Sequence, residues 1–485
     1  MVLPSRKARS RAERRRFWIR RGTTISLIAM LWISIYLMAL DFLGSYHWAD
    51  SNDNMNGPPN HQVPDFLAGR ERRRDQHPPS RSSASSSKNW LFGGISSNSE
   101  LTPSGRVKVD VNNHNEALKV VLSASVHLID IRSDARAMTD STDDETYSGI
   151  TAEFCALDFK KQRRDPSSVP MFRQLVASSR GCQSGTHYEV DLKSFVRLAR
   201  EKDQEESSKV QALPLRGVVF HESRCGSTLV ANAMVAMNPT GHRVYSESAP
   251  PIEAIHTVCG ELYQHCSLAQ AASLLQDVIY AMSRSLDELE ESMFFKIQSI
   301  GSRNIEVFQH AFPTTPWIFV YRDPVQVMAS HLEQGTSHAN CVIRRHGMRG
   351  FGGGDAFVNH YLKEHNIDKH TLSDVEYCAV HLATITDTAV QALQSGGMGK
   401  AVNYASLPQI LWEQVLPNHF QVKVTDEQVE NMQSIAGVYS KGTAGRHGTF
   451  KDDTEKKDKK ATPEMREASE RFLQSSYEEL LQYGF

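Results

Sequence analysis

The chain has 485 residues, and 54 lysine and arginine residues face 56 aspartate and glutamate residues, so its net charge is −2. A balance this close to neutral argues against a protein that binds nucleic acid through its overall charge. The length accommodates two or three average domains, or one large α/β domain with tails. The seven cysteines are too few and too scattered for a disulfide scaffold. None of them has the spacing of a zinc site, and no metal is predicted.

The first hundred residues differ in composition from the rest of the chain. Residues 1–22 form a basic tail in which Glu13 is the only acid. Residues 23–40 carry no charge and would span roughly 27 Å as a helix, close to the thickness of an early secretory membrane. We predict a transmembrane signal-anchor over residues 23–43, with its N-terminus in the cytosol. A cleaved signal peptide and an arginine-rich transit peptide are the alternatives.

A low-complexity segment follows the predicted anchor. Residues 44–110 contain two Pro-Pro pairs and a serine-rich run, and too few apolar residues to offset the entropy of ordering, which predicts a disordered stem. This layout resembles that of Golgi-resident transferases, which implies a single-pass type II membrane protein with a lumenal globular part. In a lumen, we expect the disulfides Cys155–Cys182 and Cys259–Cys266, with Cys225 remaining a thiol.

Residues 111–210 are predicted to form an N-terminal extension of the lumenal domain. The alternating apolar residues between Ala117 and Ile131 predict one or two strands. Asp191–Arg200 is predicted to be a short helix. No motif in this region indicates a chemical role.

Residues 211–485 are predicted to form an α/β domain. Its short apolar runs have the composition of buried strands, and segments with helical spacing of apolar residues lie between them. One such segment, Leu268 to Leu289, predicts an amphipathic helix with leucines up to Leu289 on its buried face. The alternation predicts a P-loop-like parallel sheet with helices on both faces. The clearest strands are Gly217–Phe220, Met293–Ile297 and Trp317–Tyr321.

The strand Gly217–Phe220 leads through a turn into a helix that begins at Ser227. The start of a helix presents unpaired N–H groups and partial positive charge, which suit a phosphate. Arg224 adds a cation with forked donors, and Ser227 and Thr228 add hydroxyls next to Gly226. A plain strand–helix turn capped by serine and threonine is the alternative. The segment is not the nucleotide loop G-x-x-x-x-G-K-[ST], because no lysine precedes Ser227.

Two further cations follow predicted strands. Lys296 lies at the end of one strand, and Arg322 follows another, with Ser330 in the next helix. Ligands of open α/β sheets bind beyond the carboxyl ends of the strands, so these cations predict a polyanionic ligand. Glu247 follows a short strand near the same edge. It is a candidate base, with an ordinary surface glutamate as the alternative.

These segments together resemble the sulfotransferase superfamily that uses 3′-phosphoadenosine 5′-phosphosulfate (PAPS). Ser223–Leu229 is similar to the loop that binds the 5′-phosphosulfate. Phe319–Pro324, with Ser330 eight residues after Arg322, resembles the motif that binds the 3′-phosphate. Ser440-Lys441-Gly442 is similar to a late R-K-G segment that closes over the nucleotide, although a serine replaces the arginine. The arginine in the loop favours the membrane-bound kind, and tyrosylprotein sulfotransferases are the most similar in motif style.

The resemblance implies a role for each matched residue. Gln298 stands where cytosolic members have a base histidine, whereas Glu247 lies in the place of the glutamate base of tyrosylprotein sulfotransferases. The implied catalytic residues are Glu247 as base, Lys296 at the sulfuryl oxygens or the bridging oxygen, and Arg224 at the leaving group. The implied nucleotide-binding residues are Arg224, Cys225, Gly226, Ser227, Thr228, Arg322, Ser330, Lys441 and Gly442.

We therefore expect a Golgi enzyme that transfers a sulfuryl group from PAPS to a hydroxyl of a protein tyrosine or a glycan, without a metal. Its partners would be the protein or glycan acceptor and the membrane but no nucleic acid, and a homodimer is an open alternative to a monomer. The competing hypotheses are a P-loop kinase or NTPase and a sulfotransferase-like binding protein without catalysis. The basic, glycine-rich segment 334–355 is either a lid that recruits an acidic acceptor or a flexible surface insertion.

Overall fold

A computed structural model describes residues 105–133, 147–333, 335–336, 339–345, 354–439, 448–449 and 453–485. The predicted basic tail and the anchor 23–43 lie outside the described residues, as does most of the predicted stem. No helix in the described part has the length and apolar character needed to cross a membrane. The first strand, β1 (Arg106–Lys108), falls within the last residues of the predicted stem 44–110.

The centre of the domain is a five-stranded parallel sheet, and its strand order is β11-β10-β6-β9-β7. The four pairings between neighbouring strands are all parallel. The sheet confirms the predicted parallel α/β architecture, and it adds a strand, β11, that the sequence did not indicate. Its strands are β6 (Leu215–His221), β7 (His242–Ser246), β9 (Ser292–Lys296), β10 (Trp317–Tyr321) and β11 (Gly399–Asn403).

Both faces of this sheet are buried, as the continuous apolar strand sequences require. Successive residues of a strand point to opposite faces. Val219 and Ile318, which pair across β6 and β10, belong to a core shared with α7 (Ser227–Met237). Phe220 and Phe319 pair one step further along and belong to the core on the other face. The register of β6 and β10 therefore places residues that pair across the two strands in the same core.

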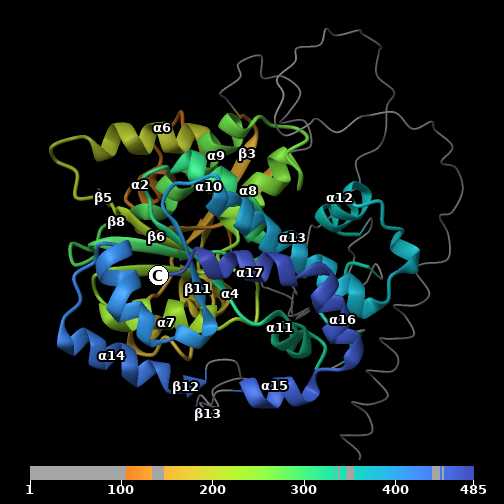
Figure 1. Cartoon of the computed structure of the whole chain (residues 1–485). Helices are drawn as coiled ribbons and strands as arrows, with labels where there is room; N and C mark the ends of the chain where they lie inside the picture. The colour runs from red at the N-terminus through yellow and green to blue at the C-terminus, as the bar shows by residue number, and fades with distance from the viewer. Residues whose placement is uncertain are drawn as a thin grey trace, which may run out of the picture. The chain divides into compact units, whose positions relative to one another are not determined.

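Helices cover both faces, as predicted. On one face α7 packs against α14 (Asp426–Ala436), whose N-terminus is capped by Thr425 and Gln428. On the other face α9 (Leu268–Ser283) packs against α8 and α10, and α13 (Asp374–Gln394) lies beside them (Figure 1). The remaining helices of this domain are α8 (Pro250–Cys259), η1 (Ser299–Asn304), α10 (Ile305–Ala311), α11 (Pro324–His331), α12 (Ala356–Glu364), η4 (Lys369–Thr371), η5 (Tyr404–Ser406), the π-helix η6 (Leu411–His419), α15 (Thr454–Lys460), α16 (Pro463–Phe472) and α17 (Gln474–Gln482). Two short ladders pair β5 (Gln211–Ala212) with β8 (Arg284–Ser285) and β12 (Val438–Tyr439) with β13 (Gly448–Thr449).

The N-terminal extension folds around a second, mixed sheet with the order β1-β4-β3-β2. Its apolar side chains belong to the same core as those on one face of the parallel sheet, so the extension and the α/β domain share one core. A buried Arg284, which binds Asp203 and two backbone carbonyls, joins β8 to the extension. The elements are β2 (His127–Ser133), β3 (Ile150–Cys155), β4 (His187–Asp191), α2 (Glu116–Leu122), α3 (Lys160–Arg164), α4 (Phe172–Ser178), α5 (Arg180–Gln183) and α6 (Leu192–Asp203).

Two predicted elements differ in the structure. Residues 117–131 were predicted as strands, but their first part is helix α2, because Asn115 caps its N-terminus and its apolar residues have helical spacing. The predicted helix Leu268 to Leu289 ends at Ser283, where the chain turns into β8. Leu289 is consequently 65% exposed instead of buried. The helix over Asp191–Arg200 is confirmed as α6, with Asp191 as its N-cap.

Three disulfides are present. The predicted pairs Cys155–Cys182 and Cys259–Cys266 are confirmed, and Cys341–Cys378, which the sequence did not indicate, ties residues 339–345 to α13. Cys225 keeps a buried thiol, as predicted.

Candidate active site at the strand ends

The carboxyl ends of all five parallel strands carry the candidate site. Because the strands are parallel neighbours, their last residues meet along one edge of the sheet. The groups that the sequence predicted at separate positions therefore lie on adjacent strands. In sheet order, this edge carries Tyr404 after β11, Arg322 after β10, the loop 222–226 after β6, Lys296 at the end of β9 and Glu247 after β7.

The loop after β6 has an unusual backbone. Ser223 has φ 76° and Arg224 has φ 58°, both in the left-handed region that side chains disfavour. Gly226 follows with φ 86° and forms the N-cap of α7. Strained backbone of this kind costs roughly 1–3 kcal/mol per residue and clusters at functional sites. Glu247, with φ 57°, is a third non-glycine residue of this kind at the same edge.

The N-terminus of α7 faces this edge without a capping side chain, because its N-cap is a glycine. Ser227 and Thr228 begin the helix and are buried. A Cβ atom on Gly226 would lie 2.8 Å from the ring of Tyr404, so the loop and the segment after β11 are in close contact. The predicted strand–turn–helix is confirmed, and Gly226 is required both for its φ and for this contact.

Two contacts join the loop to the end of β10. The Nε–H of Arg224 donates to Oγ of Ser330 in α11 at 2.7 Å, which brings together the two predicted phosphate motifs. The carboxylate of Glu222 accepts from the backbone N–H of Arg322 at 2.5 Å. Burial raises the pKa of Glu222 well above its ordinary value, although the hydrogen bond from Arg322 opposes that rise. The sequence did not indicate this role of Glu222.

The guanidinium of Arg322 is buried and already has partners. It donates to Gln326 at 2.8 Å and to Asp453 at 2.8 Å, and it stacks on the ring of Tyr404 at 4.1 Å. Asp453 precedes α15, and its side chain is 40% exposed. An anion that binds Arg322 would therefore compete with this carboxylate.

Glu247 is held from three sides. Its N–H donates to the carbonyl of Lys296 at 2.7 Å, and its own carbonyl accepts from Gln298 Nε2 at 3.3 Å. Its carboxylate forms an ion pair with Nζ of Lys296, a side chain that is 1% exposed. These contacts offset the strained backbone of Glu247. Gln298, at the position where the resemblance implies a base histidine in other members, thus fixes the backbone of the candidate base.

A histidine that sequence reasoning did not select lies beside this pair. His221 is the last residue of β6 and is buried, and its Nε2 lies 3.8 Å from Oε1 of Glu247. The only sequence signal was its place immediately before the loop. Tyr404 also escaped notice, because it follows a strand that was not predicted.

Two predicted nucleotide-binding residues and one predicted segment fall in gaps of the structure. Lys441 and Gly442 lie outside the described residues, as does most of the segment 334–355. Within the described part, no group of three or more His, Cys, Asp or Glu side chains is placed to hold a metal ion.

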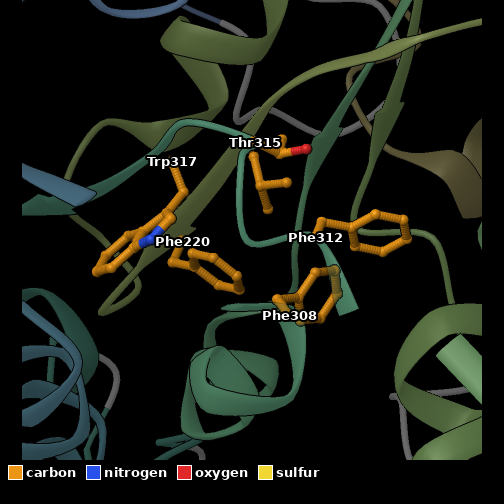
Figure 2. A pocket seen from close by; sticks show the side chains of 6 residues that line it. Phe220, Phe308, Phe312, Thr315 and Trp317 are labelled. Atoms are coloured by element: carbon orange, nitrogen blue, oxygen red, sulfur yellow. The ribbon is translucent and has the colours of Figure 1, made fainter. Parts of the chain in front are cut away.

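A pocket lies away from this edge, between the sheet and α10 (Figure 2). Its walls are almost entirely aromatic and apolar, and such walls do not stabilise phosphate charge. A larger pocket opens near the amino ends of β10 and β11, where Pro313 and Met398 lie. Neither pocket contains a predicted site residue. The residues that line the first are Val218, Phe220, Phe308, Phe312, Thr315 and Trp317.

No family model and no curated protein matches this chain. Among solved structures, it is similar to the sulfotransferase domain from the curacin biosynthetic pathway, with 13% identity over 54% of this chain and 98% of that chain and a TM-score of 0.28. It is also similar to sulfotransferase STF1 from Mycobacterium tuberculosis H37Rv, with 14% identity over 58% and 82% of the chains and a TM-score of 0.30. Sulfotransferase STF9 from Mycobacterium avium has 12% identity over 66% and 87% of the chains and a TM-score of 0.30. Likeness at this level does not assign a function, so the assignment depends on the site residues.

Proposed function

We propose that this chain is a sulfotransferase that transfers a sulfuryl group from PAPS to a hydroxyl of a protein tyrosine or a glycan in the secretory pathway. The observation that carries the proposal is the hydrogen bond from Arg224 to Ser330. It joins two segments that would hold opposite phosphates of a single nucleotide. Tyr404 supports the same arrangement, because it contacts both Gly226 and Arg322.

The groups at the strand ends fit a donor with two separate phosphates. Arg224 and the first amides of α7 would hold the 5′-phosphate. Arg322 and Ser330 would hold the 3′-phosphate, with Arg322 released from Asp453. The donor supplies an activated sulfuryl group, and the chain supplies fixed positive charge and orientation.

Glu247 and Lys296 would act on the transferred group together. Glu247 would take the proton of the acceptor hydroxyl as the new oxygen–sulfur bond forms and the bond from sulfur to the phosphate oxygen breaks. The products are a sulfate ester and adenosine 3′,5′-bisphosphate, with one proton on Glu247. The ion pair between Glu247 and Lys296 links proton uptake by the carboxylate to charge stabilisation by the ammonium. Once the carboxylate is neutral, the ammonium of Lys296 is available to stabilise charge on the leaving phosphate.

The disulfides support the compartment in this proposal. Disulfides persist in oxidising compartments such as the secretory pathway, and they are rare in the cytosol. One pair lies within the extension, one lies at the end of α8, and one joins residues 339–345 to α13. A Golgi membrane location with the anchor over residues 23–43 is part of the same proposal.

The test uses the full-length chain, purified in a mild detergent, with labelled PAPS and a panel of tyrosine peptides and glycans. We expect label on one acceptor class, and binding of adenosine 3′,5′-bisphosphate but not of ATP. Glu247→Gln should lower transfer by about 10²–10⁴-fold with nucleotide binding kept. Glu291→Gln is the matched control, because Glu291 is exposed just before the other end of β9 and should leave transfer unchanged. Tight ATP binding, or transfer that survives Glu247→Gln, would contradict the proposal.

A further inference from the structure

His221 is fixed in place at the end of β6 although no role has been assigned to it. Its backbone N–H donates to Oγ of Ser302 at 3.0 Å, and the same hydroxyl donates back to the carbonyl of His221 at 3.0 Å. Ser302 is fully buried in η1. This double contact fixes the backbone from which the imidazole projects.

The loop sets the tautomer of the ring. The N–H of Ser223 donates to Nδ1 of His221 at 3.0 Å, so Nδ1 carries a lone pair and the hydrogen of the neutral ring is on Nε2. Nε2 lies 3.8 Å from Oε1 of Glu247. His221 therefore faces the carboxylate with a donor, and in this tautomer it has no lone pair with which to act as a base there.

We propose that His221 is a positioning residue that, together with Lys296, holds Oε1 of Glu247 and so fixes the orientation in which this carboxylate receives the proton of the acceptor. The proposal rests on the proposed sulfotransferase function. Two titratable groups approach Oε1 of the Glu247 carboxylate: Lys296 on β9 and His221 on β6. A small rotation of the carboxylate when an acceptor binds would close the gap to a hydrogen bond. The pair of donors would favour the ionised carboxylate before transfer and fix the direction of its second oxygen.

Two variants separate the contact with Glu247 from the contact with Ser223. His221→Asn keeps an oxygen near Nδ1 that can accept from the Ser223 N–H, but it does not reach Glu247. His221→Gln places an NH₂ group near Nε2 and loses the acceptor for Ser223. In the full-length chain, we expect His221→Asn to lower kcat by about 10- to 100-fold with the KM for PAPS unchanged, the effect of one hydrogen bond to a charged group. We expect its acidic pH–kcat limb to move to higher pH.

The conservative variant His221→Gln should restore kcat. His221→Gln should stay within about threefold of the native kcat, because it retains the donor to Glu247. The proposal is overturned if His221→Asn has native kcat and an unchanged pH profile. It is also overturned if His221→Gln is as impaired as His221→Asn, since a variant that keeps the donor to Glu247 would then be no better than one that lacks it.

A second measurement does not depend on activity. With ¹⁵N-labelled histidine, the signal of His221 is identified by its absence in His221→Asn. We expect an Nε2–H tautomer whose shift changes in Glu247→Gln and stays constant in the control Glu291→Gln. An Nδ1–H tautomer, or a signal indifferent to Glu247→Gln, refutes the positioning role even in an active enzyme. Failure of the native chain to bind adenosine 3′,5′-bisphosphate or to transfer sulfate would instead refute the proposed function, and the positioning role with it.

Discussion

The carboxyl edge of the parallel sheet and the pocket beneath α10 use the same strands for opposite purposes. Phe220 lines the pocket, with its ring 5.2 Å from that of Phe308 (Figure 2). The next residue, His221, faces Glu247 at the edge. One residue along β6 thus separates apolar packing from a cluster of charges. The body of the strand stabilises the fold, and its end carries the chemistry.

Packing in the pocket stabilises the folded protein, whereas several groups at the edge destabilise it. Edge-to-face aromatic pairs such as Phe220 and Phe308 add about 0.5–1.5 kcal/mol beyond their buried area. At the edge, the left-handed backbone of Arg224 and Glu247 and the buried ammonium of Lys296 are unfavourable. Because the edge itself costs stability, the apolar packing must hold it in shape. Substitutions in the two regions should therefore change different measurements.

The largest effect is expected in the apolar pocket. Phe308→Ala should destabilise the protein by about 3–5 kcal/mol, because Phe308 is 3% exposed and its removal leaves a cavity. The affinity of the folded protein for adenosine 3′,5′-bisphosphate should not change, because no pocket residue belongs to the site. Thermal unfolding and calorimetric titration at low temperature measure the two quantities.

The control for this prediction is Phe308→Leu, which retains most of the volume and should lower the midpoint of unfolding much less. Loss of nucleotide affinity in a variant that is still folded would show that the pocket and the edge are coupled. Stability and nucleotide binding would then not depend on separate regions of the sheet.

The second effect concerns Arg322. Arg322→Gln should weaken binding of adenosine 3′,5′-bisphosphate by about 10- to 100-fold, because a hydrogen bond to a charged group contributes roughly 1.5–3 kcal/mol. Stability should change far less than in Phe308→Ala, since the amide of glutamine can still donate to Gln326, the partner of the Arg322 Nε–H. Calorimetric titration of the two proteins tests this.

Asp453→Asn is the matched variant with the opposite expected sign. It removes the carboxylate that competes for Arg322, and exposed pairs of this kind contribute about 0.2–1 kcal/mol, so affinity should rise by only a few-fold. If Asp453→Asn weakened binding instead, Asp453 would be part of the nucleotide site and not its competitor.

Local patterns predicted the body of the sheet well. Trp317–Tyr321 was placed at the observed bounds of β10, because buried parallel strands have a continuous apolar composition. The same composition placed Lys296 and Arg322 at strand ends, whereas the turn at Gly226 and its helix were predicted from the glycine and from helical spacing of apolar residues. These features depend on residues close together in the chain.

Long-range contacts escaped prediction. The ion pair between Arg322 and Asp453 joins residues 131 positions apart, and the approach of Tyr404 depends on the placement of β11 at the sheet margin. Glu222 and His221 were passed over because their roles depend on partners from other strands. Residues 117–122 were mistaken for strand because a short apolar run fits both periods, and the cap at Asn115 decides for the helix.

The last effect depends on pH and is expected at Glu222, which lies where the two regions meet. Burial raises the pKa of this carboxyl above 4.5, so the folded protein binds a proton that the unfolded chain has released. The free energy of unfolding is therefore highest below about pH 4.5, as far as Glu222 is concerned. Above that pH it falls by about 1.4 kcal/mol for each pH unit, until the pKa of Glu222 in the folded protein is reached. Glu222→Gln keeps an acceptor for the Arg322 N–H but does not titrate. Unfolding midpoints measured from pH 4 to 8 should be similar for the two proteins at the acid end and should increasingly favour Glu222→Gln as pH rises. A constant difference across the range would mean that Glu222 is ionised in the fold, and the edge would then hold one more negative charge than the contacts described here assign to it.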